Sequence, residues 1–334
     1  MLGKFAAAVL MPLLSAALVG GLLKATHHDK IPPLALPVAA QARPDSGRSP
    51  SAVPPGPCLG AIPRPFTGIA VQHQPAVELA KYGETFPAAP LHIVEFYNAF
   101  GSPFVHSEAS QAVEAGMIPF IQLNPRRFSE QQIANGVWDR RIKAYAKAVK
   151  AFGCTVILSF GHEMNGWWYP WGREPAPNPS TSPAAFKAAW IHIHDIFAAQ
   201  GVTNVIWSWD PSHQHGEVGL GKIGTPASEW YPGDKYVDWI GIDGYVGAGQ
   251  NFRGVFGYQL RVIRRLTSKP IYLAETGVGD GPHERRQVAN LFAGVRQWHL
   301  IGLIWFDLNR KNSWSLEGKP AKDAAFRRGI ARFP

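Results

Sequence analysis

The sequence predicts an α/β protein, a single (β/α)8 TIM barrel preceded by an apolar N-terminal segment and a proline-rich linker. Eight short runs of apolar, β-branched or aromatic residues recur along the 334-residue chain, as expected of parallel strands buried on both faces. Helical patterns, with apolar residues at three- and four-residue spacing, lie between these runs. Without its first sixty or so residues, the chain has about the length, roughly 250 residues, that is typical of such a barrel.

An open, doubly wound sheet is the alternative arrangement of alternating strands and helices. Eight alternations favour closure into a barrel over that open sheet. The first expected strand is not followed by a glycine-rich phosphate-binding loop, which weakens the open-sheet alternative further. We expect no cofactor.

The chain divides into three expected parts. Residues 1–30 contain an apolar run, 5–23, that is typical of a signal peptide or of a membrane anchor. Residues 31–58 are rich in proline without a periodic apolar face, which indicates a flexible or extended tether. Residues 59–334 form the barrel domain. Both interpretations of the first part predict export, so we expect a protein that is secreted or anchored at the outer face of the cell membrane.

The expected strands follow from the apolar runs, and four expected helices from the clearest amphipathic patterns. The strands are 66–71, 91–98, 118–123, 155–160, 204–209, 237–242, 271–274 and 302–306. The helices are 137–152, 183–200, 283–298 and 320–331. Ser182 followed by Pro183 is a typical helix start, an N-cap residue and then proline at the first helical position.

Composition favours a carbohydrate ligand. The net charge of +9 is compatible with nucleic-acid binding, but the arginine pairs are scattered through expected helices and loops, so we expect no nucleic-acid partner. The chain has 12 tryptophans, and tryptophan is rarely hidden completely. Exposed aromatic faces suit sugar rings better than phosphate. We expect a monomer, with a possible membrane tether.

The two cysteines precede barrel strands. Cys58 lies before the first strand and Cys154 begins the fourth, so both belong to the N-terminal rim of a barrel. Export permits a disulfide between them, and two separate buried thiols are the alternative. Neither lies at the C-terminal end of a strand, which argues against catalysis by cysteine.

Two glutamates follow strands that lie on nearly opposite sides of the expected barrel, at the rim where TIM barrels place their chemistry. Glu163 follows the fourth strand and Glu275 the seventh. Two such carboxyls are the equipment of a glycosidase, in which one keeps its proton and the other is ionised. Burial beside aromatic rings raises the pKa of a carboxyl, as the acid requires, so Glu163 is the expected acid. Tyr245 is our candidate hydrogen-bond donor to Glu275.

Aromatic and polar residues at the same strand ends are candidates for substrate binding. Trp168 and Trp171 belong to the aromatic cluster after Glu163, where at least one ring is expected to face the cleft. Trp209 ends the fifth strand and is as well explained by core packing. Asp243 either binds sugar hydroxyls or orients Tyr245. His213 and His215 fall short of a three-ligand metal site, so we expect no metal.

The stretch from His162 to Trp171, His-Glu-Met-Asn-Gly-Trp-Trp-Tyr-Pro-Trp, resembles the acid/base motif of glycoside hydrolase family 26. The resemblance extends to Trp-Ser-Trp-Asp-Pro at 207–211, to residues 231–245, to Ala-Glu-Thr-Gly at 274–277 and to Trp-Phe at 305–306. It implies a retaining (β/α)8 glycosidase of the endo-β-1,4-mannanase or β-1,3-1,4-glucanase type.

The same resemblance implies roles for individual residues. Glu163 is the implied acid/base and Glu275 the implied nucleophile. His162 and Tyr245 are implied hydrogen bonders, and Trp305 an implied platform under the sugar at the cleavage point. Asn165, within the motif, is a further expected substrate-binding residue.

One departure concerns specificity. Mannanases of this family often carry an arginine shortly before the His-Glu pair, where this chain has Ser-Phe-Gly at 159–161. We therefore expect a retaining endo-β-glycosidase acting on β-mannan or β-1,3-1,4-glucan. The alternatives are a non-hydrolytic polysaccharide-binding pseudoenzyme and a transglycosylase of envelope glycans.

Overall fold

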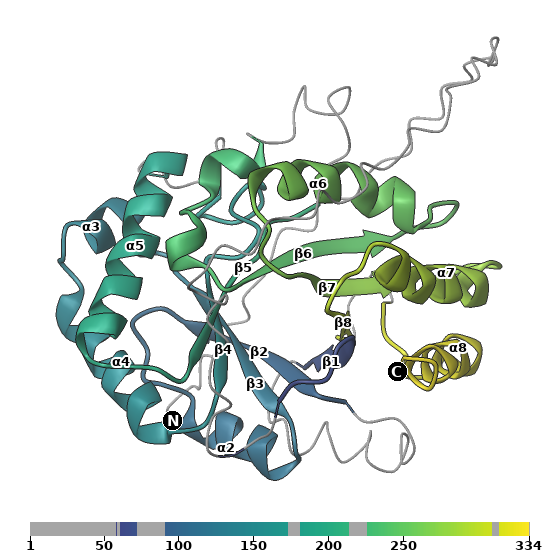
Figure 1. Cartoon of the computed structure of the whole chain (residues 1–334), viewed down its shortest axis with the longest axis horizontal. Coiled ribbons are helices and arrows are strands. Elements are labelled where there is room, and N and C mark those ends of the chain that lie inside the picture. The colour runs from purple at the N-terminus through teal and green to yellow at the C-terminus, as the bar shows by residue number, and fades with distance from the viewer. Residues whose placement is uncertain are drawn as a thin grey trace, which may run out of the picture. The chain divides into compact units, whose positions relative to one another are not determined.

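A computed structural model describes residues 58, 61–71, 91–172, 181–213, 226–308 and 314–333. Eight parallel strands close into one barrel, in which each strand pairs with its neighbours in the sequence and β1 pairs with β8 (Figure 1). This arrangement confirms the expected (β/α)8 fold. The expected N-terminal segment and almost all of the linker lie outside the described residues. No helix in the described ranges is long and apolar enough to cross a membrane.

The strands lie close to their expected positions. They are β1 Phe66–Ala70, β2 Ile93–Ala99, β3 Ile118–Asn124, β4 Val156–Phe160, β5 Val205–Trp209, β6 Trp239–Val246, β7 Ile271–Val278 and β8 Gly302–Phe306. Strands β6 and β7 each run four residues further than expected. Because of this extension, Glu275 lies within β7 rather than after it.

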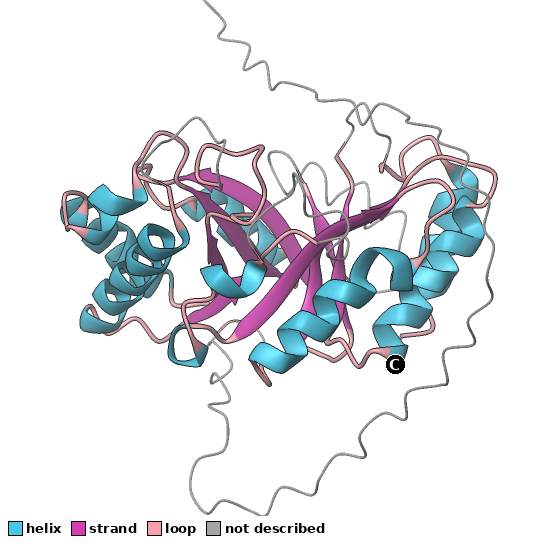
Figure 2. Cartoon of the chain, turned by 90° about the horizontal axis from the view of Figure 1, so that it is seen from above, coloured by secondary structure: helices cyan, strands magenta, loops and turns pink. Residues whose placement is uncertain are grey.

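Helices cover the outside of the barrel (Figures 1 and 2). They are α2 His106–Glu114, α3 Glu130–Ala134, α4 Asp139–Phe152, α5 Pro183–Ala199, α6 Phe252–Leu266, α7 Glu284–Gln297 and α8 Pro320–Ile330. The expected start of α5 is confirmed, because the Ser182 side chain accepts a hydrogen bond from the Ala185 N–H at 3.1 Å.

The connection between β5 and β6 is described at residues 210–213 and 226–238, and these residues contain no α-helix. Between β5 and β6, residues 226–238 form only two 3₁₀ turns, η2 Ala227–Trp230 and η3 Asp234–Tyr236. Pro232 lacks a backbone N–H, and Gly233 takes a φ of 107°. Both features end the helical hydrogen-bond pattern, so residues 226–238 form 3₁₀ turns and no α-helix.

Side chains alternate between two apolar layers along each strand, because successive residues of a strand point to opposite faces. One layer fills the barrel and includes Phe66, Phe120 and Tyr272. The other lies between strands and helices and includes Ile69, Ile121 and Leu273. At the N-terminal end, Phe66 stacks on Trp239 with ring centroids 5.6 Å apart. Packed aromatic rings therefore fill this end of the barrel.

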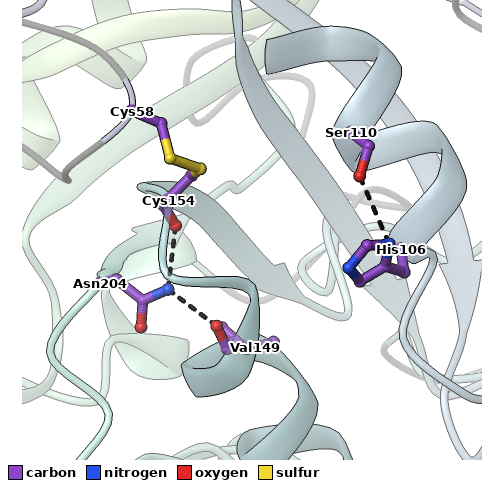
Figure 3. Close-up of a disulfide and its surroundings, with 6 residues drawn as sticks. All are labelled: Cys58, His106, Ser110, Val149, Cys154 and Asn204. Atoms are coloured by element: carbon purple, nitrogen blue, oxygen red, sulfur yellow. Dashed lines mark hydrogen bonds between the residues drawn. A yellow bond between two sulfur atoms is a disulfide. The ribbon is translucent and has the colours of Figure 1, made fainter. Parts of the chain in front are cut away.

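Cys58 and Cys154 form a disulfide, which decides between the two alternatives for these residues (Figure 3). The Cα atoms are 5.1 Å apart, and 96 residues separate the two positions in the sequence. Cys154 lies just before β4, where Asn204 donates hydrogen bonds to the Cys154 and Val149 carbonyls. The bridge therefore lies at the N-terminal rim, opposite the strand ends that carry the candidate chemistry.

Candidate active site

Glu275 points into the barrel mouth because of an irregularity in β7. Gly241 pairs with Tyr272 and Asp243 pairs with Glu275, so two steps along β6 correspond to three along β7. Such a β-bulge adds one residue to a strand and changes the face on which the following side chains lie. Without it, Glu275 would be on the same face as Leu273, which packs in the outer layer. The bulge therefore turns Glu275 toward the interior.

Two tyrosine hydroxyls hold the carboxyl group of Glu275. Tyr97 from β2 donates to Oε1 at 2.7 Å, and Tyr245 from β6 donates to Oε2 at 2.6 Å. Burial and the charge of Glu275 raise the pKa of both hydroxyls well above the usual value, so both remain protonated donors. Hydrogen bonds of this kind stabilise a carboxylate in its charged form and fix its orientation. The expectation that Tyr245 holds Glu275 agrees with this geometry.

Glu163 stands in a tight turn directly after β4. Its backbone has a φ of 53°, in the left-handed region that non-glycine residues rarely adopt. Its N–H donates to the Asp210 carbonyl at 2.7 Å, and its own carbonyl accepts from the Gly166 N–H at 2.8 Å. Backbone strain of this kind costs on the order of 1–3 kcal/mol and is found most often at functional sites.

The environment of Glu163 keeps its carboxyl protonated near neutral pH. Burial, followed by the negative charge of Glu275, raises the pKa of Glu163 to about 8. Trp168 opposes this shift by donating from Nε1 to Oε2 at 2.5 Å, and Ser212 also hydrogen-bonds the carboxyl. Because the charge of Glu275 is felt at Glu163, the two carboxyls belong to one electrostatic site.

His162 lies beside Glu275 and is neutral. Its Nδ1 is 2.9 Å from Oδ1 of Asn124, which can only accept, so this nitrogen carries the proton. Burial lowers the pKa of the ring to about 3. The other nitrogen, Nε2, has no hydrogen-bond partner among the described residues and is 3.9 Å from Oε1 of Glu275. It is therefore available as a hydrogen-bond acceptor beside Glu275.

The aromatic cluster after Glu163 divides into an exposed and a buried part. Trp168 is 40 % exposed and combines an open ring face with its hydrogen bond to Glu163. Trp171 is buried, donates to the His162 carbonyl at 2.8 Å and stacks on Tyr169 with centroids 4.4 Å apart. The expectation that Trp171 binds substrate is therefore wrong, because its ring supports the loop.

The side chain of Asn165 bonds to the backbone of a neighbouring loop. Its side-chain amide donates to the Ser212 carbonyl and accepts from the Ser212 N–H, both at 2.9 Å. The side chain is buried. These two bonds tie the loop after β4 to the loop after β5, and the expected contact of Asn165 with sugar stays a prediction.

Two further tryptophans pack on the outside of the barrel. Trp209 is fully buried against Tyr231, with centroids 5.0 Å apart. Trp305 is fully buried against Phe326 of α8, also at 5.0 Å. Both rings belong to the outer apolar layer, on the face away from the barrel interior. The expectation that they contact substrate is therefore wrong.

A further tryptophan, Trp314, lies close to the candidate site. It is partly exposed and stacks on Tyr245 with centroids 4.7 Å apart. Its backbone carbonyl accepts from Trp305 Nε1 at 3.1 Å. Gly277 makes room for it, because a Cβ at this position would approach the Trp314 side chain to 3.1 Å. The ring therefore lies next to the tyrosine that holds Glu275.

Additional acids lie inside the barrel near Glu275. Asp243 is fully buried, and both its carboxyl oxygens have no hydrogen-bond partner among the described residues. Burial and the charges of Glu275 and Glu163 raise its pKa well above the usual value. Glu95 is held by Gln122 at 2.9 Å, and the same amide lies 3.3 Å from Asp210. Whether Asp243 binds sugar hydroxyls stays a prediction.

The described residues contain no group of three or more potential ligands that could hold a metal ion. His213 packs near Phe256, and its backbone N–H donates to the Asp243 carbonyl at 2.7 Å. His215 lies outside the described residues.

Comparison with known proteins assigns the family. Residues 123–309 match the family model for glycosyl hydrolase family 26. The chain is 30 % identical over 276 residues to Endoglucanase H of Acetivibrio thermocellus, which covers 79 % of this chain and 30 % of that protein. The chain belongs to glycosyl hydrolase family 26.

A second curated relative of this family 26 chain is the mannan endo-1,4-β-mannosidase A and B of Caldalkalibacillus mannanilyticus. It is 25 % identical over 173 residues, which are 49 % of this chain and 31 % of that protein. The chain thus spans about a third of the length of these relatives. By family, this chain is a glycoside hydrolase.

Solved structures share the fold of this family 26 domain. A Bacillus subtilis mannanase superposes with a TM-score of 0.58 at 18 % identity, over 80 % of this chain and 85 % of that one. The family 26 domain of an endo-β-mannanase/endo-β-glucanase from Prevotella bryantii gives a TM-score of 0.58 at 17 % identity, over 82 % and 90 % of the two chains. These similarities support the barrel and leave the substrate to be argued from the site.

The sequence patterns of this family 26 domain do not indicate four of the residues at the site, Tyr97, Asn124, Ser212 and Trp314. The alternation of side chains along β2 could have indicated that Tyr97 points into the barrel. Val94 and Phe96 pack in the outer layer, so Glu95 and Tyr97 point inward. Trp314 follows a stretch that the structure does not describe, and no strand periodicity indicates where its ring lies.

Proposed function

We propose that the protein hydrolyses a β-linked polysaccharide with retention of configuration, through a covalent intermediate on Glu275. The observation that carries this proposal is the contrast between the surroundings of the two glutamates. Glu275 accepts hydrogen bonds from two tyrosine hydroxyls, which favour the ionised carboxylate. The pKa of Glu163 is raised to about 8, so its carboxyl is protonated near neutral pH. Retaining glycosidases require this pair of states.

The first step forms a bond between a Glu275 oxygen and the anomeric carbon of the sugar. The bond from that carbon to the glycosidic oxygen breaks, and the oxygen takes the proton of Glu163 as the leaving chain departs. Loss of this proton leaves Glu163 ionised, able to act as a base. In the second step, Glu163 removes a proton from water, the water oxygen attacks the anomeric carbon, and the ester bond to Glu275 breaks.

Trp168 and Trp314 are the rings with which we propose the site holds sugar units. Trp168 is the more exposed of the two, and its indole N–H donates a hydrogen bond to Glu163. Trp314 lies beside Tyr245. Aromatic faces near both carboxyls suit the apolar faces of pyranose rings on the two sides of the cleaved bond.

For the substrate, we propose a β-glucan or β-mannan. The names of the two curated relatives, an endoglucanase and a mannan endo-1,4-β-mannosidase, support this class. We also propose that the protein is exported and acts as a monomer. The disulfide at the N-terminal rim supports export, because disulfides persist in oxidising compartments.

The test is a panel of neutral β-glucans, β-mannans and β-xylans, with product mapping and NMR of the first-formed anomer. We expect endo cleavage of one glucan or mannan, with the β-anomer released first. Glu275→Ala is expected to lose several orders of magnitude in kcat. Azide is expected to restore turnover by attacking the anomeric carbon from the side that Glu275 occupied, which gives an inverted, α-configured glycosyl azide. Glu114→Ala, an exposed glutamate at the end of α2, is the matched control.

The panel also separates the alternatives. Longer chains as the main product would identify a transglycosylase, and binding without cleavage would identify a pseudoenzyme. The α-anomer as the first product, or full activity in Glu275→Ala, would contradict the proposed mechanism.

A further inference from the structure

A hollow lined by arginines lies at the same rim of the barrel as the active site. Its volume is about 260 Å³, and its lining includes Arg126, Arg127 and Arg141 together with the rings of Phe100 and Phe128. Ligand pockets commonly measure roughly 300–1,000 Å³, so this hollow suits a group of about one sugar unit.

The hollow lies next to strand residues that hold the candidate catalytic groups. Ala99, part of its lining, pairs with Asn124 in the last step of the β2–β3 ladder. Asn124 holds His162, and Tyr97, two residues before Ala99, holds Glu275. The hollow therefore lies at the C-terminal ends of β2 and β3, on the helix side of the barrel wall whose inner side carries Tyr97.

The three guanidinium groups are exposed and carry uncompensated charge. None of them lies within 4.0 Å of a carboxylate in the part of the chain that the structure describes. Asp139, in the first turn of α4, is already engaged by His192 at 2.6 Å and Lys143 at 3.1 Å. These guanidinium groups are therefore open to solvent, or to an anion that is not among the described residues.

Two of the three arginines are also held in place. Arg141 donates to the Gly101 carbonyl at 2.8 Å and lies over the Trp138 ring, 5.5 Å from its centroid. Arg127 lies 5.6 Å from the centroid of the Phe128 ring. Stacked guanidiniums keep their in-plane N–H donors free, and these donors match the geometry of a carboxylate or phosphate. Fixed donors bind an anion with less loss of side-chain entropy.

We propose that this arginine hollow binds an anionic substituent of the polysaccharide, a carboxylate or a phosphate on a sugar near the cleaved bond. The proposal rests on the proposed glycosidase function and assigns a preference to it. Phe100 and Phe128 form part of the lining but are almost wholly buried, so the arginine side chains supply the contacts to the ligand. A single hollow next to the cleft fits a substituted glycan better than nucleic acid, whose phosphates need an extended basic track.

The experiment compares three forms of the backbone that the panel selects: neutral, partly oxidised to carboxylate at C6, and partly phosphorylated at C6. We expect the wild type to favour at least one charged form, with kcat/KM that declines as salt is raised. Arg126→Gln combined with Arg127→Gln is expected to lose about tenfold in kcat/KM on that form, the loss of about one charge-assisted hydrogen bond. Activity on the neutral backbone is expected to be unchanged.

The matched control is Arg261→Gln combined with Arg265→Gln, which removes the same charge from exposed positions of α6. We expect it to behave as the wild type on all three forms, and thermal melting establishes that both variants are folded. The charged form that loses more identifies the source, carboxylate or phosphate. Equal losses on neutral and charged forms, equal losses in the control, or equally tight binding of a single-stranded oligonucleotide would overturn the proposal.

Calorimetry with the Glu275→Gln variant and oxidised oligosaccharides separates this inference from the proposed function. Binding that depends on Arg126 and Arg127 supports the hollow even if no backbone is cleaved. Cleavage of neutral chains without any such dependence supports the glycosidase and rejects the hollow.

Discussion

The hydroxyl of Tyr97 lies 2.7 Å from Oε1 of Glu275 and donates a hydrogen bond to it. This contact joins β2 to β7 across the barrel mouth, between residues 178 positions apart in the sequence. With Tyr245 on the other oxygen, it leaves Glu275 with little rotational freedom. Both oxygens are then fixed before substrate binds, which reduces the reorganisation needed in the reaction.

Replacing Tyr97 with phenylalanine removes this donor and little else. We expect kcat to fall by about tenfold or more, since a hydrogen bond to a charged group contributes roughly 1.5–3 kcal/mol. The acidic limb of the rate profile should move to higher pH, because the ionised form of Glu275 loses stabilisation. Rate–pH profiles of Tyr97→Phe and of the control Tyr236→Phe test this expectation. An unchanged profile in Tyr97→Phe would leave that hydroxyl without a role.

The basic limb of the rate–pH profile should reflect the ionisation of the Glu163 carboxyl. With its pKa at about 8, the carboxyl is protonated below that pH and able to donate, so activity should fall as the pH rises through about 8. The Trp168 hydrogen bond lowers this pKa, so Trp168→Phe should move the basic limb to higher pH. Rate–pH profiles on a short soluble substrate measure the shift. Movement to lower pH would show that Trp168 affects the site in another way.

Substitution of Trp314 should affect substrate binding, whereas substitution of Trp305 should affect the stability of the fold. Trp314→Ala is expected to raise KM by about tenfold, with little change in melting temperature, because its ring is partly exposed beside Tyr245. Trp305→Ala opens a cavity in the outer layer and should cost about 3–5 kcal/mol in the free energy of unfolding. Steady-state kinetics and denaturant unfolding on both variants measure the two effects. The reverse assignment of effects would restore Trp305 as the platform.

The disulfide should matter for stability and not for catalysis. It closes a loop of nearly a hundred residues at the rim opposite the active site. Changing Cys58 and Cys154 together to serine is expected to cost about 2–5 kcal/mol in the free energy of unfolding. kcat and KM should remain those of the wild type. A loss of activity at temperatures where the variant is folded would show that the bridge also affects the mouth.

Much of the fold was predictable because buried parallel strands read as apolar runs, and the eight runs found in the sequence are the eight strands of the barrel. The two 3₁₀ turns at residues 226–238 were not, because a general rule of alternation takes no account of Pro232 and Gly233. Glu163 and Glu275 were chosen for their places at strand ends. The inward direction of Glu275 depends on a β-bulge, which no local pattern indicates.

The predictions that Trp209 and Trp305 contact substrate failed because they did not consider to which face of the sheet each side chain points. Counting alternate residues along β5 and β8 would have placed Trp209 and Trp305 in the outer layer, next to helices. Asn165 and Trp171 lie in a turn without strand or helix periodicity, so their contacts with Ser212 and Tyr169 depend on the folded loop. Resemblance to a family indicated the region of these residues and not the direction of each side chain.

The most direct test of the central claim is to trap the covalent intermediate with an activated 2-deoxy-2-fluoro β-glycoside of the preferred sugar. The account predicts a mass increase of one fluorosugar per protein, located by peptide mapping on Glu275 and absent from Glu275→Gln. A fluorosugar attached to any other residue, or steady turnover of a productive substrate without a trappable ester on Glu275, would contradict it.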